Sequence, residues 1–143
     1  MPLPDPQLGL VISYGYLWRR EHHSGQREGR KDRPCVIVLA VDRGATGTIV
    51  TVVPVTHSEP KDPLVAIELP QPVKRHLGLD SERSWVIVDE GNRFVWPGFD
   101  LRLVPRSNSR YDYGFLPPRL FAAIATRFET VWTAQQGKAV PRD

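Results

Sequence analysis

Arg33 and the run Thr56-His57-Ser58 are the residues of this chain whose types best suit chemistry on a phosphate group. Arg33 stands directly before Pro34 and the apolar run Cys35–Val41, which is typical of a strand buried on both faces. Pro34 suits the first position of such a strand because it has no N–H to donate. Arg33 is therefore expected at a strand end. An arginine beside hydroxyl groups can bind phosphate oxygens through paired, charge-assisted hydrogen bonds.

A second apolar run brings the hydroxyl groups to this arginine. Thr48–Thr56 follows the first run after a turn-rich connection at residues 42–47, and this spacing predicts an antiparallel hairpin. Antiparallel pairing places the far end of the second strand beside the start of the first. Thr56, His57 and Ser58 are therefore expected close to Arg33.

The positive charge of the chain is concentrated in the segment that ends at Arg33, directly before Pro34 and the apolar run Cys35–Val41. The net charge is +3, and residues 19–33 hold six Lys or Arg against three Asp or Glu, which accounts for the whole surplus. This local excess favours an anionic partner, with Arg27, Arg30 and Lys31 as the nearest basic side chains. The alternative is that residues 19–32 form an ordinary solvated loop.

Short apolar segments separated by turns surround the hairpin. Strands are expected over 9–18, 64–69, 84–90, 94–96 and 101–104, with a helical turn over 72–78. Gly15 indicates a bulge or a close backbone approach. A long helix is expected from Pro117-Pro118, because apolar residues recur there at helical spacing.

This pattern predicts a mainly β fold, a small and strongly bent β-barrel with a C-terminal α-helix. The expected organisation is an extended tail over 1–8, one barrel domain over 9–136 and a frayed tail over 137–143. Trp85 and Trp96 are expected in the core rather than as stacking platforms for bases, because aromatic strand residues mostly pack inward.

Several classes of protein do not fit the composition. The 143 residues are 41% hydrophobic and 24% charged, which is typical of a globular chain. No apolar run reaches the roughly 18–20 residues of a membrane-spanning helix, and residues 1–6 lack a signal pattern, so a cytoplasmic protein without a membrane partner is expected. The single Cys35 forms no internal disulfide and is expected in the core. The four His follow no metal-ligand pattern and no nucleotide-binding loop is present, so neither a metal nor a cofactor is expected.

Three segments resemble the MazF/PemK-like toxins of bacterial toxin–antitoxin systems. They are Lys31-Asp32-Arg33-Pro34 with its apolar strand, Val53-Pro54-Val55-Thr56, and Ser84-Trp85 with Val88-Asp89, and the likeness spans about residues 9–104. The resemblance implies an SH3-like barrel of the MazF/PemK/CcdB type that acts as a homodimer. It also implies a metal-independent endoribonuclease of the mRNA interferase type, which cleaves single-stranded RNA and is silenced by a cognate acidic antitoxin.

The resemblance implies specific roles for Arg33 and Thr56, which match the family's catalytic pair. The implied reaction is attack of the ribose 2′-OH on the adjacent phosphorus, giving a 2′,3′-cyclic phosphate and a 5′-OH. The chain departs from the PemK branch, which has an arginine at Ile87 and a histidine in the loop where Arg27 stands. His57 is therefore the candidate for proton exchange, since imidazole titrates near neutral pH.

Seven further residues are candidates for binding RNA. Arg27, Arg30, Lys31 and Ser58 are expected to hold phosphates, and Asn92 and Arg93 to read base edges. Asp89 either orients Arg33 through an ion pair or is a simple carboxylate at a strand end.

The sequence is also compatible with two other functions. The related CcdB-like toxins use the same fold to poison gyrase without cutting nucleic acid, and the missing arginine at Ile87 favours that reading. The second alternative is a barrel that binds RNA or protein and has no toxic role.

Overall fold

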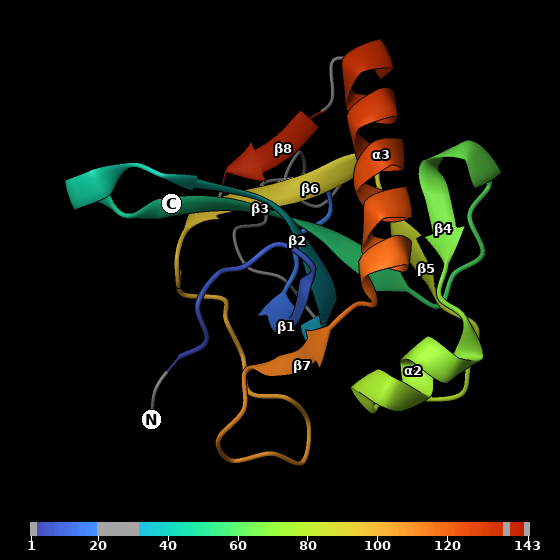
Figure 1. Cartoon of the computed structure of the whole chain (residues 1–143), viewed down its shortest axis with the longest axis horizontal. Helices are drawn as coiled ribbons and strands as arrows, with labels where there is room; N and C mark the ends of the chain where they lie inside the picture. The colour runs from blue at the N-terminus through green and yellow to red at the C-terminus, as the bar shows by residue number, and fades with distance from the viewer. Residues whose placement is uncertain (1–2, 20–31, 136–137, 142–143) are drawn as a thin grey trace.

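The computed structural model describes residues 3–19, 32–135 and 138–141, which form a mainly β fold with a C-terminal helix (Figure 1). The strands are β1 (Leu10–Gly15), β2 (Asp32–Asp42), β3 (Thr48–Thr56), β4 (Ala66–Glu68), β5 (Trp85–Ile87), β6 (Glu90–Val95), β7 (Asp112–Phe115) and β8 (Lys138–Pro141). The helices are α2 (Gln71–Leu77) and α3 (Pro118–Gln135), and short 3₁₀ turns lie at Gly44–Thr46 and Pro63–Val65.

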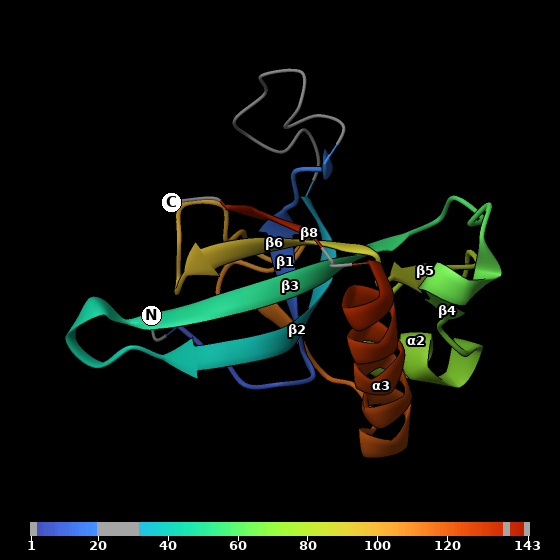
Figure 2. The same ribbon diagram turned by 90° about the horizontal axis from the view of Figure 1, so that it is seen from above.

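The β2–β3 hairpin is the centre of one curled sheet. Its strand order is β4-β5-β3-β2-β1-β7, with β6 paired to β3 and β8 paired to β6. β3 changes partners along its length, pairing with β6 in its first half and with β5 at Val55 and Thr56. This change bends the sheet into a half-barrel, and it places β4, β5 and α2 at the opposite end from the hairpin turn (Figures 1 and 2). The predicted bent barrel with a C-terminal helix is confirmed.

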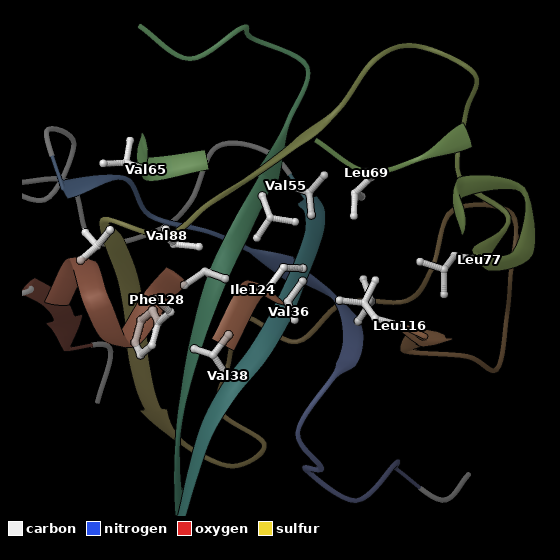
Figure 3. Close-up of a cluster of buried hydrophobic side chains, with 14 residues drawn as sticks. Val36, Val38, Val55, Val65, Leu69, Leu77, Val88, Leu116, Ile124 and Phe128 are labelled. Atoms are coloured by element: carbon white, nitrogen blue, oxygen red, sulfur yellow. The ribbon is translucent and has the colours of Figure 1, made fainter. Parts of the chain in front are cut away.

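Both faces of the central strand β2 are buried over residues 35–38. Val36 and Val38 face the larger core beneath α3, shown in Figure 3, whereas Cys35 and Ile37 face a second core on the other side of the sheet. All four side chains are at most 4% exposed. The prediction of a strand buried on both faces is confirmed for residues 35–38 but is wrong for Leu39 and Val41, which are exposed toward the hairpin turn. The placement of Cys35 in the core is confirmed.

α3 covers the larger core with its apolar stripe. Ile124, Phe128 and Val131 are buried in that core, and Trp132 Nε1 donates to Val88 O at 2.6 Å. The helix begins at Pro118, where the missing N–H of proline costs no helical bond. No helix in the described part of the chain is long and apolar enough to cross a membrane.

Two sequence predictions near the end of the chain are wrong. The strand expected at 101–104 is only an isolated bridge between Leu101 and Tyr14, and Asp112–Phe115 pairs with β1 instead. Lys138–Pro141 is not a frayed tail but forms β8, parallel to β6. Gly15 does mark a close approach, because a Cβ there would lie 3.2 Å from Asp100 Oδ1.

Candidate functional site

The open end of the β2–β3 hairpin forms one wall of a pocket of about 730 Å³. The β2–β3 register ends at the pair Cys35 and Pro54, and just beyond this pair Arg33 and Thr56 line the same pocket. His57 and Ser58 continue this wall. The predicted proximity of Arg33 to Thr56, His57 and Ser58 is therefore confirmed. The loop after α2 forms a second wall, with Leu79, Asp80 and Ser84. The segment before and within β7 forms a third, with Val104, Pro105, Arg106 and Tyr113.

The Arg33 side chain is positioned by packing and a backbone contact. Its Cζ lies 5.0 Å from the centre of the Trp18 ring, a cation–π geometry, and Nη1 donates to Val55 O at 3.4 Å. Its Nε is buried and finds no hydrogen-bond partner among the described groups. The guanidinium is thus held in place while part of its hydrogen-bonding capacity stays unused.

The acidic neighbour of Arg33 is engaged elsewhere. Asp32 faces Arg102 Nε at 3.6 Å, and Arg102 also donates to the buried carboxylate of Asp100 at 2.9 Å. Within the described residues, no ion pair joins Arg33 to any carboxylate. The positive charge of Arg33 therefore has no acidic partner there, and it can interact with an anion that enters the pocket.

Thr56 and Ser58 form a small hydroxyl-bearing turn at the end of β3. The Thr56 Oγ1 accepts a hydrogen bond from the Ser58 N–H at 3.1 Å. Because that bond uses the oxygen as an acceptor, the Thr56 O–H can still donate. Thr56 is half-buried and Ser58 is exposed, and both line the pocket.

His57 is anchored to the opposite wall by Asp80. The His57 Nε2 lies 2.9 Å from Asp80 Oδ2, and Lys74 Nζ donates to Asp80 Oδ1 at 2.9 Å. Partial burial acts to raise the pKa of Asp80, but the hydrogen bonds from Lys74 and His57 outweigh it and lower that pKa below its usual value. Asp80 therefore stays ionised and fixes the orientation of the imidazole through Nε2. His57 Nδ1 lies 3.8 Å from Glu82 Oε2, beyond hydrogen-bond distance, so this nitrogen can exchange a proton with a ligand.

Lys74 is only 1% exposed, and it organises the loop that carries Asp80. Besides Asp80, its ammonium group donates to Ser84 Oγ at 2.7 Å and to the Glu82 carbonyl oxygen. All three donor positions of the ammonium are thus used. A buried lysine with a full set of acceptors is a fixed structural anchor for the neighbouring pocket wall.

One group of side chains has the composition of a metal site. His57, Asp80 and Glu82 place one possible ligand atom each within 4.8 Å of one another, and all three are exposed. The buried Lys74 ammonium already contacts Asp80 Oδ1, however, so a metal ion bound there would lie close to a fixed positive charge. The arrangement suits a histidine held between carboxylates better than a divalent cation.

Three predicted RNA-binding residues lie outside the pocket. Asn92 is buried, and its amide exchanges hydrogen bonds of 2.9 and 2.7 Å with the Leu17 backbone. The prediction that Asn92 reads a base edge is therefore wrong. Arg93 is exposed and lies opposite Thr51 in the β3–β6 ladder.

Asp89 is a half-buried carboxylate between β5 and β6, and it makes no ion pair with Arg33 in the described part of the chain. Burial raises the pKa of Asp89, and the nearby charge of Arg19 partly offsets this effect. Of the two readings of Asp89, the simple strand-end carboxylate fits the structure.

Arg27, Arg30 and Lys31 lie outside the described residues. Sequence reasoning also missed Lys74, Asp80, Arg106 and Tyr113, all of which belong to the pocket or support its wall. Of these four residues only Lys74 has a signal in the sequence, because it lies three residues before the apolar Leu77 and so on the same face of the helical turn.

No protein-family model matches the chain, and a search of curated proteins finds no match. The residues and geometry of this pocket are therefore the guide to function.

Proposed function

We propose that this protein is a metal-independent endoribonuclease of the toxin–antitoxin type, which cleaves single-stranded RNA at the hairpin-end pocket. The observation that carries the proposal is the meeting of Arg33, Thr56 and His57 in one pocket. Arg33 and Thr56 come from two strand ends far apart in sequence, which the antiparallel β2–β3 pairing brings together, with Arg33 Nη1 donating to the carbonyl oxygen of Val55, the neighbour of Thr56.

Each of the three residues has a role that its surroundings support. The Arg33 fork, unpaired with any described carboxylate, stabilises the negative charge that develops on the pentacoordinate phosphorus. Deleting one such donor typically raises the activation barrier by about 3–4 kcal/mol. The Thr56 O–H donates to a non-bridging oxygen and holds the phosphate in line with its attacking group.

His57 is the proposed general base. The 2′-oxygen attacks phosphorus as its proton moves to His57 Nδ1, and the bond from phosphorus to the 5′-oxygen breaks. The leaving oxygen takes a proton from water, so the products are a 2′,3′-cyclic phosphate and a 5′-OH. Asp80 holds the imidazole in place through Nε2.

The proposal also covers the cellular compartment, the inhibitor and the oligomeric state of the protein. An RNA-cleaving toxin acts in the cytoplasm, where mRNA is exposed, and a cognate antitoxin must cover the pocket to protect the cell. An acidic, disordered antitoxin segment would complement the Arg33 guanidinium and fold as it binds. A homodimer would present two such pockets, as the family resemblance implies.

The proposal is tested by incubating the protein with a long single-stranded RNA in EDTA and mapping the ends. We expect cuts at a repeated short motif, cyclic phosphate at the new 3′ ends, and a loss of at least about a hundredfold in rate for Arg33→Ala. Arg43→Ala, at the far turn of the same hairpin, removes an equal charge outside the pocket and should retain activity. Full activity of Arg33→Ala would contradict the proposal. RNA that is bound but left intact would favour a non-catalytic binding toxin.

A further inference from the structure

Arg106 occupies a turn position that arginine rarely adopts. The Ser107 N–H donates to Val104 O at 2.9 Å, which closes a four-residue turn with Pro105 and Arg106 at its centre. Proline fixes the first central φ at a negative value, and Arg106 has a φ of +67°, so the turn is of type II. This position favours glycine or asparagine, and an arginine there is strained. Such strain is concentrated at functional sites in folded proteins.

The strained turn lines the same pocket as the open end of the β2–β3 hairpin. Arg106 is exposed and makes no hydrogen bond or ion pair with any described residue. Its neighbours differ, because Arg102 is paired with Asp100 and Asp32, and Arg110 lies 3.5 Å from Asp112. Arg106 is thus a second guanidinium in the pocket, besides Arg33, that has no acidic partner in the described chain.

We propose that Arg106 binds a second phosphate of the RNA, adjacent to the scissile phosphate at Arg33. This inference rests on the proposed nuclease function and adds a subsite to it. Two guanidinium groups in one pocket, neither with an acidic partner among the described residues, suit two neighbouring anionic groups better than one. The pocket of about 730 Å³ also lies well inside the range of about 300–1,000 Å³ that encloses a drug-sized ligand, so it has room for more than a single phosphate.

The turn geometry allows a variant that separates binding from folding. Arg106→Gly removes the guanidinium, and glycine adopts a positive φ without strain, so the variant should fold at least as stably as the parent. Arg43→Gly is the matched control. It removes the same charge in another turn, at the opposite end of the β2–β3 hairpin (Figure 2).

The experiment measures the affinity of each protein for a fluorescent single-stranded RNA whose riboses all carry 2′-O-methyl groups, so that no 2′-OH can attack. We expect Arg106→Gly to bind at least about tenfold more weakly than the parent, since a charged hydrogen bond is lost. The slope of log K against log salt should fall in magnitude by about 0.7, the value for one phosphate of a single strand. Arg43→Gly should retain the parent's affinity to within about twofold.

Two outcomes would contradict the role of Arg106 as a phosphate-binding residue. Equal affinity and equal salt slope in the parent and Arg106→Gly would overturn the inference, and so would a lower melting temperature for Arg106→Gly, since that result indicates a structural role. Failure of the nuclease proposal is distinguishable, because the analogue cannot be cleaved. Arg106-dependent binding of the analogue, with unmodified RNA left intact, would contradict cleavage and uphold the second phosphate site.

Discussion

At the scale of single residues, the central feature is a positive charge that the fold positions without neutralising it. Arg33 packs on Trp18 and contacts the Val55 carbonyl, while Arg102 engages the adjacent Asp32. The neighbouring carboxylate, Asp32, thus pairs with Arg102 and not with Arg33. This division of charge is what makes Arg33 a candidate for binding a phosphate rather than a structural ion pair.

A second residue of interest is Glu90, a buried carboxylate away from the pocket. It is 9% exposed, and its Oε1 accepts hydrogen bonds from Tyr16 Oη and the Arg19 N–H, both at 3.0 Å. Burial raises the pKa of Glu90, and the two hydrogen bonds only partly offset this effect. Burial also raises the pKa of Tyr16, with the Glu90 charge adding to the shift, so Tyr16 remains a donor.

These pKa directions predict how Glu90→Gln changes stability with pH. A carboxyl group whose pKa is raised on folding stabilises the fold below its unfolded pKa, near 4.5, and loses that contribution as the pH rises through the folded value. Glutamine keeps the Oε1 acceptor and removes the buried charge. We therefore expect Glu90→Gln to match the parent near pH 4 and to exceed its free energy of unfolding at pH 7, measured by urea denaturation.

The control for this prediction is Glu129→Gln, which makes the same change at an exposed position on α3. It should leave the free energy of unfolding within about 0.5 kcal/mol of the parent at both pH values. A Glu90→Gln protein that is less stable than the parent at pH 7 would show that the ionised carboxylate stabilises this part of the fold.

At the scale of elements, the loop between α2 and β5 is the part of the pocket most dependent on one side chain. Lys74 lies in the last turn of α2 and contacts Asp80, Glu82 and Ser84 across that loop. Asp80 in turn holds His57 at the end of β3. A helix, a loop and a strand end are thereby joined through one buried ammonium group.

This arrangement predicts two effects of Lys74→Met. The apolar side chain fills much of the same space but leaves the loop acceptors unpaired, so the free energy of unfolding should fall by about 1–3 kcal/mol. The pKa of Asp80 should rise, because the Lys74 hydrogen bond lowers it. The midpoint of the Asp80 titration, followed by NMR of its carboxyl carbon, should therefore lie at higher pH than in the parent.

Lys61→Met serves as the control, because Lys61 is exposed in the loop before β4. It should change neither the stability nor the titration of Asp80. An unchanged Asp80 titration in Lys74→Met would show that Lys74 stabilises the loop without acting on the pocket through Asp80.

The central elements could be predicted from sequence because their signals are local. Two apolar runs joined by a short turn predict one hairpin, and antiparallel pairing then fixes which ends meet, so Arg33 and Thr56 could be placed together. β7 was missed because the run Asp112–Phe115 contains Asp and Gly, which are depleted in strands, and its strand state depends on pairing with β1. Asn92 was misplaced because only the fold shows that the Leu17 backbone needs its amide.

The other walls of the pocket depend on contacts that no local pattern specifies. Asp80 contacts His57 across 23 residues of sequence, and Arg106 lines the same pocket from a turn far along the chain. The left-handed conformation of Arg106 opposes its residue preference, so sequence rules predict no such turn there. The sequence therefore predicts the pocket wall formed by the hairpin end, but not the walls formed by the loop after α2 and by the segment before β7.

At the scale of the whole molecule, the curled sheet explains why these walls come together. β3 pairs first with β6 and then with β5, and this bend carries β5, the preceding loop and α2 toward the open end of the hairpin. α3 covers the larger core from the other end of the chain (Figure 3). The pocket thus lies where rigid strand ends meet two loops, an arrangement that holds functional side chains in place.

The most direct test of the account is cleavage of an RNA that differs from its control by one oxygen atom. A single-stranded RNA containing the mapped cleavage motif is compared with the same strand carrying one 2′-deoxyribose on the 5′ side of the cut, both in EDTA. The account predicts that the unmodified strand is cut to a cyclic phosphate and a 5′-OH, and that the substituted strand stays intact at that position. Equal cleavage of both strands would show that the 2′-OH is not the nucleophile and would contradict the proposed mechanism.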